Sequence, residues 1–209
     1  MKTSILKLSH QKMNTKKLGT LFMSFSFLLL LSSCITRQVQ RVSPDQQIDV
    51  SGRWNSTDSK LTADAMIDQI LMQPWLEDFQ KANNRKPVLV VGLISNKSHE
   101  HIESDIFIND LEKTFIGTGK VRLVQAGDKR EELRSERAGQ QDYASNETIK
   151  KWGQELGADY ILQGSVNSIV DGFNREKVLF YKVTLQLTNV ETNEVVWMGD
   201  KEIKKYIRN

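Results

Sequence analysis

The last third of the chain alternates apolar and polar residues in a way that predicts a β-meander. Residues 159–170 and 177–190 each show a two-residue period, and residues 195–198 begin a third segment of the same kind. Polar turn sequences, residues 171–174 and 191–194, separate the three segments. Alternation bounded by Gly, Asn, Asp and Thr is typical of antiparallel strands joined by tight turns. We therefore expect three antiparallel strands here.

The middle of the chain follows a different pattern. Residues 88–94 form an unbroken apolar run, which is typical of a parallel strand covered on both faces. Residues 105–116 place Ile108, Leu111 and Phe115 at helical spacing, and residues 121–124 alternate as a second strand would. The order strand, helix, strand predicts that this part adds parallel pairing to the sheet.

Helical periodicity appears in three further places. The first such segment is capped by Asp58 or Ser59 and is ended or kinked at Pro74, after which another short helical stretch follows. Residues 129–137 predict a heavily charged helix, and residues 149–156 predict another, opened by a nearby Ser or Thr. The whole pattern predicts an α/β (α+β) fold: a small mixed β-sheet flanked by helices, β-α-β and then a three-stranded antiparallel meander.

The amino-terminal segment has a pattern of its own. Lys16 and Lys17 precede an apolar run, residues 18–31, which is too short to span a bilayer that needs about 20 residues. A basic start followed by a short apolar core predicts a secretory signal. The run ends in two Ser residues and Cys34, and it resembles the lipobox of bacterial lipoproteins. Either Met1 or Met13 is compatible with this leader.

The lipobox resemblance implies that residues 1–33 are removed and that Cys34 carries the lipid anchor. Residues 34–50 are polar and predict a flexible tether, and residues 51–209 form the globular domain. Ile35 favours the outer membrane over inner-membrane retention, and the lack of an acidic run after Cys34 favours a periplasm-facing protein.

Charge and cysteine content exclude several classes of function. Five of the 29 Lys and Arg residues lie in the leader, which has no acidic residue, so 24 basic residues remain against 26 acidic ones. The mature chain is therefore not basic, and we expect no nucleic-acid partner. A single Cys allows neither an intramolecular disulfide nor a Cys-based metal cluster.

The candidate chemical motifs are weak. Gly117, Gly119 and Lys120 resemble part of a phosphate-binding loop, but they end a predicted helix rather than open one. His99 and His101, with Glu103, could hold a metal, yet a polar loop after a strand explains them as well. The chain has no G-x-S-x-G motif. We therefore expect no catalytic residue, metal site or cofactor.

Several short stretches, taken in order, resemble the penicillin-binding-protein activator (LpoB) family of outer-membrane lipoproteins. Their shared feature is position along the chain rather than any one decisive motif. They are residues 51–55 (SGRWN), 74–76 (PWL), 86–92 (KPVLVVG), 94–97 (ISNK), 119–122 (GKVR), 157–164 (GADYILQG) and 192–197 (TNEVVW). The last two also look like the amino-terminal domain of TolB and the curli-pore (CsgG) lipoproteins.

The resemblance implies a protein that is not an enzyme. It implies a lipid-anchored periplasmic activator that binds a bifunctional penicillin-binding protein, a peptidoglycan synthase, and stimulates peptidoglycan synthesis. We expect a monomer. The alternative is a structural or assembly lipoprotein of the envelope, and a third hypothesis is an envelope hydrolase. Family members of enterobacteria carry a long Pro-rich tether, whereas this tether has about 16 residues and one Pro.

The expected partner surface has two parts. The loop after the first strand and the charged helix supply most of its residues, and Trp54 either packs at the edge of the core or anchors a partner. The candidate partner-binding residues are Trp54, Asn96, Lys97, His99, Arg130 and Arg134.

Overall fold

The computed structural model describes residues 38–43, 46–143 and 156–208. The chain divides into two units, Met1–Pro44 and Asp45–Asn209, and the fold below belongs to the second. The described helices are α2 (Ser56–Leu71), α3 (Pro74–Asn83), α4 (Ser104–Thr118) and α5 (Gly127–Tyr143). The strands are β1 (Val88–Lys97), β2 (Arg122–Leu123), β3 (Tyr160–Phe173), β4 (Glu176–Asn189) and β5 (Val195–Arg208).

Two predictions concern parts of the chain outside these residues. The leader with Cys34 and the helix expected over residues 149–156 fall mainly on positions that the structure does not describe. Within the described ranges, no helix is long and apolar enough to cross a membrane.

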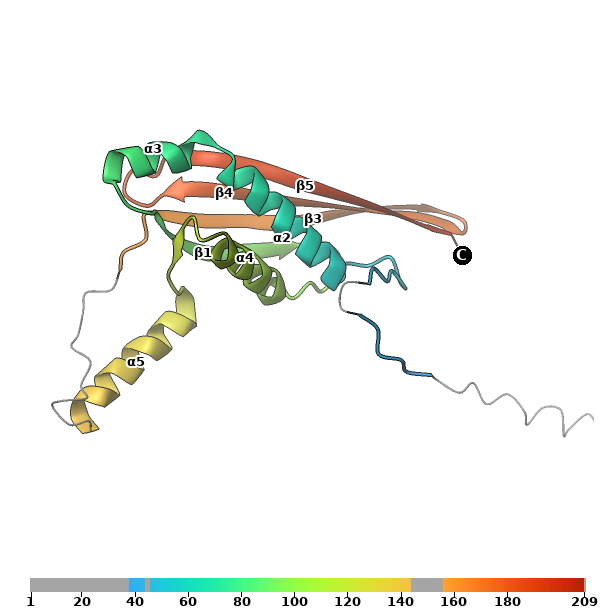
Figure 1. Ribbon diagram of the computed structural model, residues 1–209. Helices are drawn as coiled ribbons and strands as arrows, with labels where there is room; N and C mark the ends of the chain where they lie inside the picture. Colours follow the sequence, from blue (N-terminus) through green and yellow to red (C-terminus); the bar gives the residue numbers. More distant parts are fainter. Residues whose placement is uncertain (1–37, 44–45, 144–155, 209) are drawn as a thin grey trace, which may run out of the picture. The chain divides into compact units, whose positions relative to one another are not determined.

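The strands form one mixed sheet in the order β2-β1-β3-β4-β5 (Figure 1). β1 pairs in parallel with both β2 and β3, and β3, β4 and β5 pair antiparallel. The mixed sheet and the meander are therefore confirmed. β5 is much longer than the apolar segment 195–198 that the sequence indicated. Its second half, residues 201–208 (KEIKKYIR), mixes charged and apolar residues on both faces and so lacks the apolar–polar alternation of a half-buried strand.

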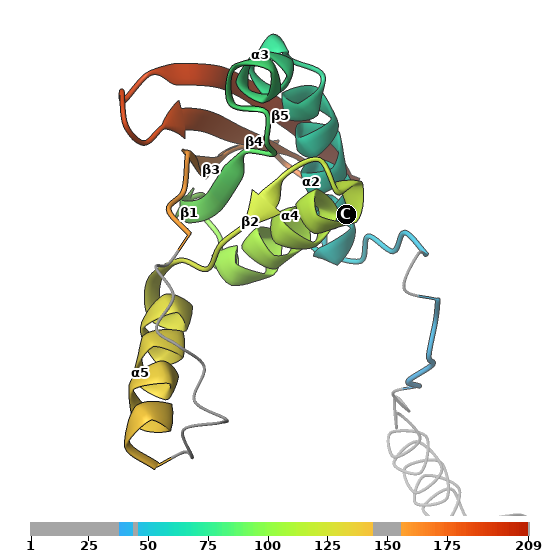
Figure 2. The same ribbon diagram turned by 60° about the vertical axis from the view of Figure 1, so that its left-hand side comes forward.

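Two helices cover one face of this sheet, and α3 lies over its end at the β4–β5 turn (Figures 1 and 2). Alternate residues of the strands face α2 and α4, so the side chains at every second position of the meander form the sheet side of the core. The largest side chains enclosed there are Tyr181, Phe107, Phe115, Met66, Ile67, Ile70, Leu89, Ile94, Leu111, Leu162, Leu179 and Leu185. By area, each such side chain contributes about 1.5–3 kcal/mol of transfer free energy.

The first helix begins earlier than the sequence predicted. α2 starts at Ser56, and its cap is Asn55 rather than Asp58 or Ser59. The Asn55 side chain accepts hydrogen bonds from the N–H groups of Thr57 and Asp58, at 2.9 and 3.2 Å. The Asp58 carboxylate in turn accepts a hydrogen bond from the Asn55 N–H at 2.9 Å, which completes a capping box. Asp58 is thus the third residue of the helix, and its carboxylate binds the backbone N–H of the cap residue.

The other helix ends follow the sequence closely. α2 ends before Pro74, and Pro74 opens α3 at a position where its missing N–H costs nothing. α4 ends at Gly119, which adopts the left-handed conformation at a φ of 62°. The glycines near residue 120 therefore end a helix and are not a phosphate-binding loop.

Candidate functional site

Residues 49–55, here called the strap, lie against the distal half of the meander. Gly52 has a φ of +69°, and a β-carbon at this position would come within 2.4 Å of the Ile207 side chain. Glycine is therefore required both for the backbone conformation and for the close approach to β5. The motif Ser-Gly-Arg-Trp-Asn thus fixes the path of the chain just before α2.

Trp54 is half-buried at the edge of the core. Its ring makes edge-to-face contacts with Phe107 and Tyr181, with centroids 6.2 and 5.6 Å apart. The backbone N–H of Trp54 donates to both the Tyr181 hydroxyl (3.1 Å) and the Glu100 carboxylate (3.2 Å). Packing at the core edge is confirmed. A contact of Trp54 with a partner remains a prediction.

The same cluster keeps the Tyr181 hydroxyl protonated. Burial, followed by the hydrogen bond to the Glu100 carboxylate, raises the pKa of Tyr181 well above its ordinary value. The hydroxyl can therefore donate to Glu100 while it accepts from Trp54. This network joins three segments far apart in the sequence: the strap, the loop after β1, and the middle strand of the meander.

Lys205 of β5 binds both the strap and the first turn of α2. The Lys205 ammonium donates to the Asp49 and Asp58 carboxylates, each at 2.6 Å, and to the carbonyl of Arg53 at 3.1 Å. Burial acts to lower the pKa of Lys205, but the two carboxylates outweigh it and the pKa is raised. The hydrogen bond from Lys205 is the largest cause of the lowered pKa of Asp49. Both ends of the strap are thus tied to charged groups of the folded domain.

The loop after β1 is organised by Asn96 and Ser98. The Asn96 side-chain oxygen accepts from the Ser98 N–H at 2.9 Å and from its hydroxyl at 2.7 Å, and its amide donates to the Glu100 carbonyl at 2.8 Å. His99 is exposed, and its N–H donates to the Ser168 hydroxyl on β3 at 2.9 Å. Lys97 is exposed at the end of β1. The structure therefore brings Trp54, Asn96, Lys97 and His99 to one end of the domain.

The histidines of this loop have partners other than a shared metal. The His99 ring nitrogen Nδ1 lies 3.1 Å from the Ser168 hydroxyl, and His101 Nε2 lies 2.6 Å from the Glu103 carboxylate. Among the residues that the structure describes, no three His, Cys, Asp or Glu side chains are grouped as metal ligands. The geometry of this loop is that of a polar surface loop held on the sheet.

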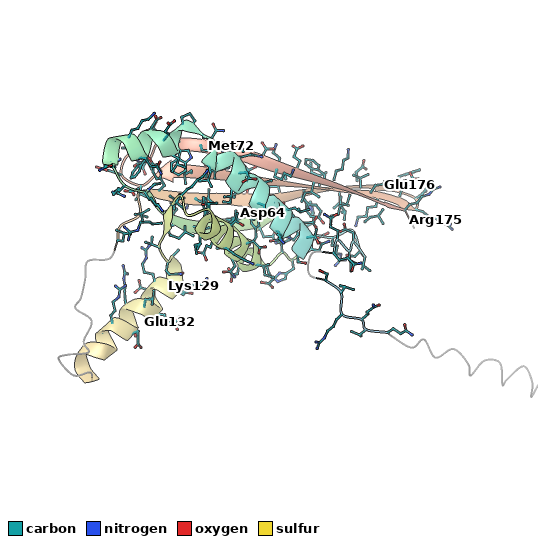
Figure 3. The ribbon with its side chains drawn as sticks, in the orientation of Figure 1. Asp64, Met72, Lys129, Glu132, Arg175 and Glu176 are labelled. Carbon is teal, nitrogen blue, oxygen red and sulfur yellow. The ribbon has the colours of Figure 1, made fainter. Side chains whose placement is uncertain are left out.

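Arg130 and Arg134 form a separate group on α5. The Arg130 Nε donates to the Gln125 carbonyl at 2.7 Å, and Arg134 pairs with Glu131 one turn before it. Lys129 reaches from the first turn of α5 to Asn109 and Glu112 of α4. Figure 3 labels Lys129 and Glu132 on this helix. Over residues 127–139, no side chain is buried, so α5 presents charged groups to its surroundings.

A cleft of about 700 Å³ lies at the other end of the sheet, between α3 and the β4–β5 turn. Arg85 and Asp159 make a bidentate ion pair at its edge, with both N···O distances 2.7 Å. Asp159 also accepts from the Val88 N–H at 2.8 Å. Burial acts to raise the pKa of Asp159, but Arg85 and the Val88 N–H outweigh it, and the pKa is lowered.

Sequence reasoning did not identify this cleft. The sequence pattern predicts only a strand from residue 159. Nothing in the local pattern indicates that Arg85 pairs with Asp159. The useful signal was an Asp at the start of a strand, just before an aromatic residue whose ring packs on α3. Tyr160 lies edge-to-face with Trp75 and Phe79, at 5.1 and 5.6 Å, so Asp159 is held at the rim by its neighbour.

These features define an α/β domain with a polar loop after β1, a charged helix α5 and a cleft beside α3. A family model, the peptidoglycan-synthase activator LpoB, matches residues 58–203. The chain belongs to this family. The search of curated proteins finds no match.

Solved structures of similar fold include LpoB C-terminal domains from two enterobacteria. The Salmonella enterica domain is 20% identical, with 64% of this chain and 96% of that chain covered, and a TM-score of 0.35. The Escherichia coli domain is 18% identical, with 71% and 99% covered, and a TM-score of 0.39. Lipoprotein GNA1162 from Neisseria meningitidis is 16% identical, with 58% and 84% covered, and a TM-score of 0.37.

Proposed function

We propose that this chain is a lipid-anchored, periplasm-facing activator that binds a bifunctional penicillin-binding protein and stimulates peptidoglycan synthesis. The observation that carries the proposal is the match of the LpoB family model over residues 58–203, which supports a peptidoglycan-synthase activator role in general. The lipobox at Cys34 supports the anchor. Ile35, directly after that Cys, supports an outer-membrane location.

Activation without catalysis requires a difference in affinity. The domain must bind the active conformation of the synthase more tightly than the inactive one, and the ratio of the two affinities limits the stimulation. A ten-fold stimulation through this route corresponds to about 1.4 kcal/mol of differential binding. The loop residues Asn96, Lys97 and His99 and the α5 residues Arg130 and Arg134 are the proposed contacts.

The test is a polymerisation assay in detergent. The full lipoprotein is added in increasing amounts to a bifunctional synthase from the same organism, and the consumption of lipid II is followed. We expect a rate that rises and saturates with dose, because a binding equilibrium saturates. A rate that stays flat, while circular dichroism shows a folded activator, would contradict the proposal. A large ring in light scattering would instead favour the assembly lipoprotein.

The anchor has an independent test. Mass spectrometry of the purified protein should find acyl chains on Cys34 as the new first residue. The Cys34→Ala variant should move from the membrane fraction to the soluble periplasmic fraction. A wild-type protein that starts at Met1 or Met13 without acyl chains would contradict the anchor, while it would leave the binding activity open to the assay above.

A further inference from the structure

The face of the meander opposite α2 and α4 carries an exposed apolar patch at its distal end. Here "distal patch" means Phe173, Tyr206 and Ile169, with exposed fractions of 81, 60 and 63%. The pairing register places them on one face, since Phe173 pairs with Glu176, Val178 with Tyr206, and Ile169 with Phe180. Val178 and Phe180 lie between them and are half-buried. Three neighbouring strands thus contribute to one continuous surface.

Cations surround this patch. Arg175, Lys204 and Arg208 border the patch together with the carboxylates Asp171, Glu176 and Glu202, and Glu202 is paired with Lys182 at 3.3 Å. Glu176 is engaged by Arg208 at 3.9 Å and by the Tyr206 hydroxyl, a bond that raises the pKa of Tyr206. In the described part of the chain, Arg175 and Lys204 make no ion pair. Figure 3 shows Arg175 and Glu176 at the tip of the meander, where β3 turns into β4.

The tether enters the domain at this same end. Asp49 binds Lys205, which lies three residues, or about 10 Å of strand, before Arg208. Fifteen residues separate Asp49 from Cys34. Fifteen residues reach about 50 Å at most, when fully extended. A lipid on Cys34 therefore keeps a bilayer within reach of the distal patch.

We infer that the distal patch is a contact site for the anionic lipid surface to which the protein is anchored. Exposed aromatic and aliphatic side chains among basic ones suit the headgroup region, where rings insert and cations meet lipid phosphates. Lys and Arg near an anionic lipid surface are attracted to it. This inference rests on the anchor proposed above. The contact orients the domain, so that the opposite end of the sheet, with the Arg85–Asp159 cleft, points away from the membrane.

The experiment uses the full lipoprotein in vesicles of phosphatidylethanolamine and phosphatidylglycerol. Because the chain has one cysteine and Cys34 is acylated, an introduced cysteine is the only free thiol. Phe173→Cys and Thr192→Cys place an environment-sensitive fluorophore on the two opposite turns of the same meander. We expect the label at 173 to shift to shorter wavelengths and to be quenched at least three-fold more by lipids with brominated acyl chains.

Each outcome decides a different claim. Flotation of the protein with the vesicles, with equal and weak quenching at both positions, would overturn the lipid contact and leave the anchor intact. Failure to float would overturn the anchor, and the contact with it. A second variant, Phe173→Ser, changes an exposed side chain and leaves the core intact. If it weakens stimulation of the synthase in detergent while the two labels are quenched equally, the patch binds protein instead of lipid.

Discussion

The Asp159 carboxylate makes contacts that an ordinary surface ion pair lacks. It holds both nitrogens of Arg85 and also accepts from the Val88 N–H at the start of β1. We expect Asp159→Ala to lower the free energy of unfolding by about 1–3 kcal/mol, because a backbone N–H loses its partner. Urea denaturation followed by circular dichroism measures this.

An exposed pair of the same chain is the control for Asp159. Glu77 and Lys81 lie four residues apart on α3 and are both mostly exposed. Glu77→Ala should change stability by less than about 0.5 kcal/mol. Since the folded pKa of Asp159 is lowered, its contribution is present above pH 3.8 and disappears as the pH falls through the folded value. Equal losses in both variants would show that Asp159 acts only as a surface charge.

Lys205 is the second residue on which a specific expectation rests. Lys205→Met removes three hydrogen bonds and leaves the buried Asp58 without its cation. We expect a loss of about 1–3 kcal/mol, because burying an unpaired carboxylate costs more than a surface pair contributes. Lys204→Met, on the neighbouring residue and the opposite face, should stay within about 0.5 kcal/mol of the wild type.

The pH dependence separates the two lysine variants further. The raised pKa of Lys205 means that its contribution is complete below pH 10.5 and is lost as the pH rises through the folded value. Because the folded pKa of Asp49 is lowered, the contribution of Asp49 to stability is present above pH 3.8 and is lost as the pH falls through the folded value. Lys205→Met should therefore flatten the stability profile at both ends. A profile that keeps the wild-type shape would contradict the role of Lys205.

At the scale of elements, two glycines should respond to alanine in opposite directions. Gly52 in the strap has a positive φ and lies against Ile207, so Gly52→Ala should destabilise the domain by about 2 kcal/mol or more. Gly139 lies inside α5 with open space around it, so Gly139→Ala should leave the domain unharmed and raise the helicity of α5, worth up to about 1 kcal/mol. Thermal unfolding of the domain and far-ultraviolet dichroism measure the two effects.

The pair of glycine variants carries its own check. If Gly52→Ala is as stable as the wild type, the strap does not lie on β5 as described. Loss of helicity in Gly139→Ala would contradict the assignment of that position to a helix interior.

The sequence predicted these elements well where periodicity alone decides the structure. The three strands of the meander, the parallel pairing of β1 and the charged helix α5 all follow from local patterns. It failed where a long-range contact decides. The cap of α2 is the exception, because Asn55 and Asp58 form a local capping box that the prediction overlooked in favour of Asp58 or Ser59. The Arg85–Asp159 pair was missed because its two residues lie 74 positions apart, and such a contact leaves no local signal.

The whole molecule presents its distinct surfaces at different places along the sheet. The strap, the loop after β1 and the distal patch lie toward the end that receives the tether, and the Arg85–Asp159 cleft lies at the β4–β5 turn. Under the proposed lipid contact, the first end faces the membrane and the Arg85–Asp159 cleft stays open to a protein.

The charged surface of α5 leads to the last prediction, which concerns binding of the synthase. The double variant Arg130→Glu and Arg134→Glu should weaken binding at least ten-fold in low salt, because complementary surface charges act over about a Debye length. The loss should shrink in 0.5 M salt. The control, Lys113→Glu with Lys120→Glu, makes the same change in net charge at exposed positions on and just beyond α4. Dichroism confirms that both variants are folded, and titration by surface plasmon resonance measures affinity. If both variants weaken binding equally, net charge rather than α5 attracts the partner, and if neither does, the docking face lies elsewhere on the domain.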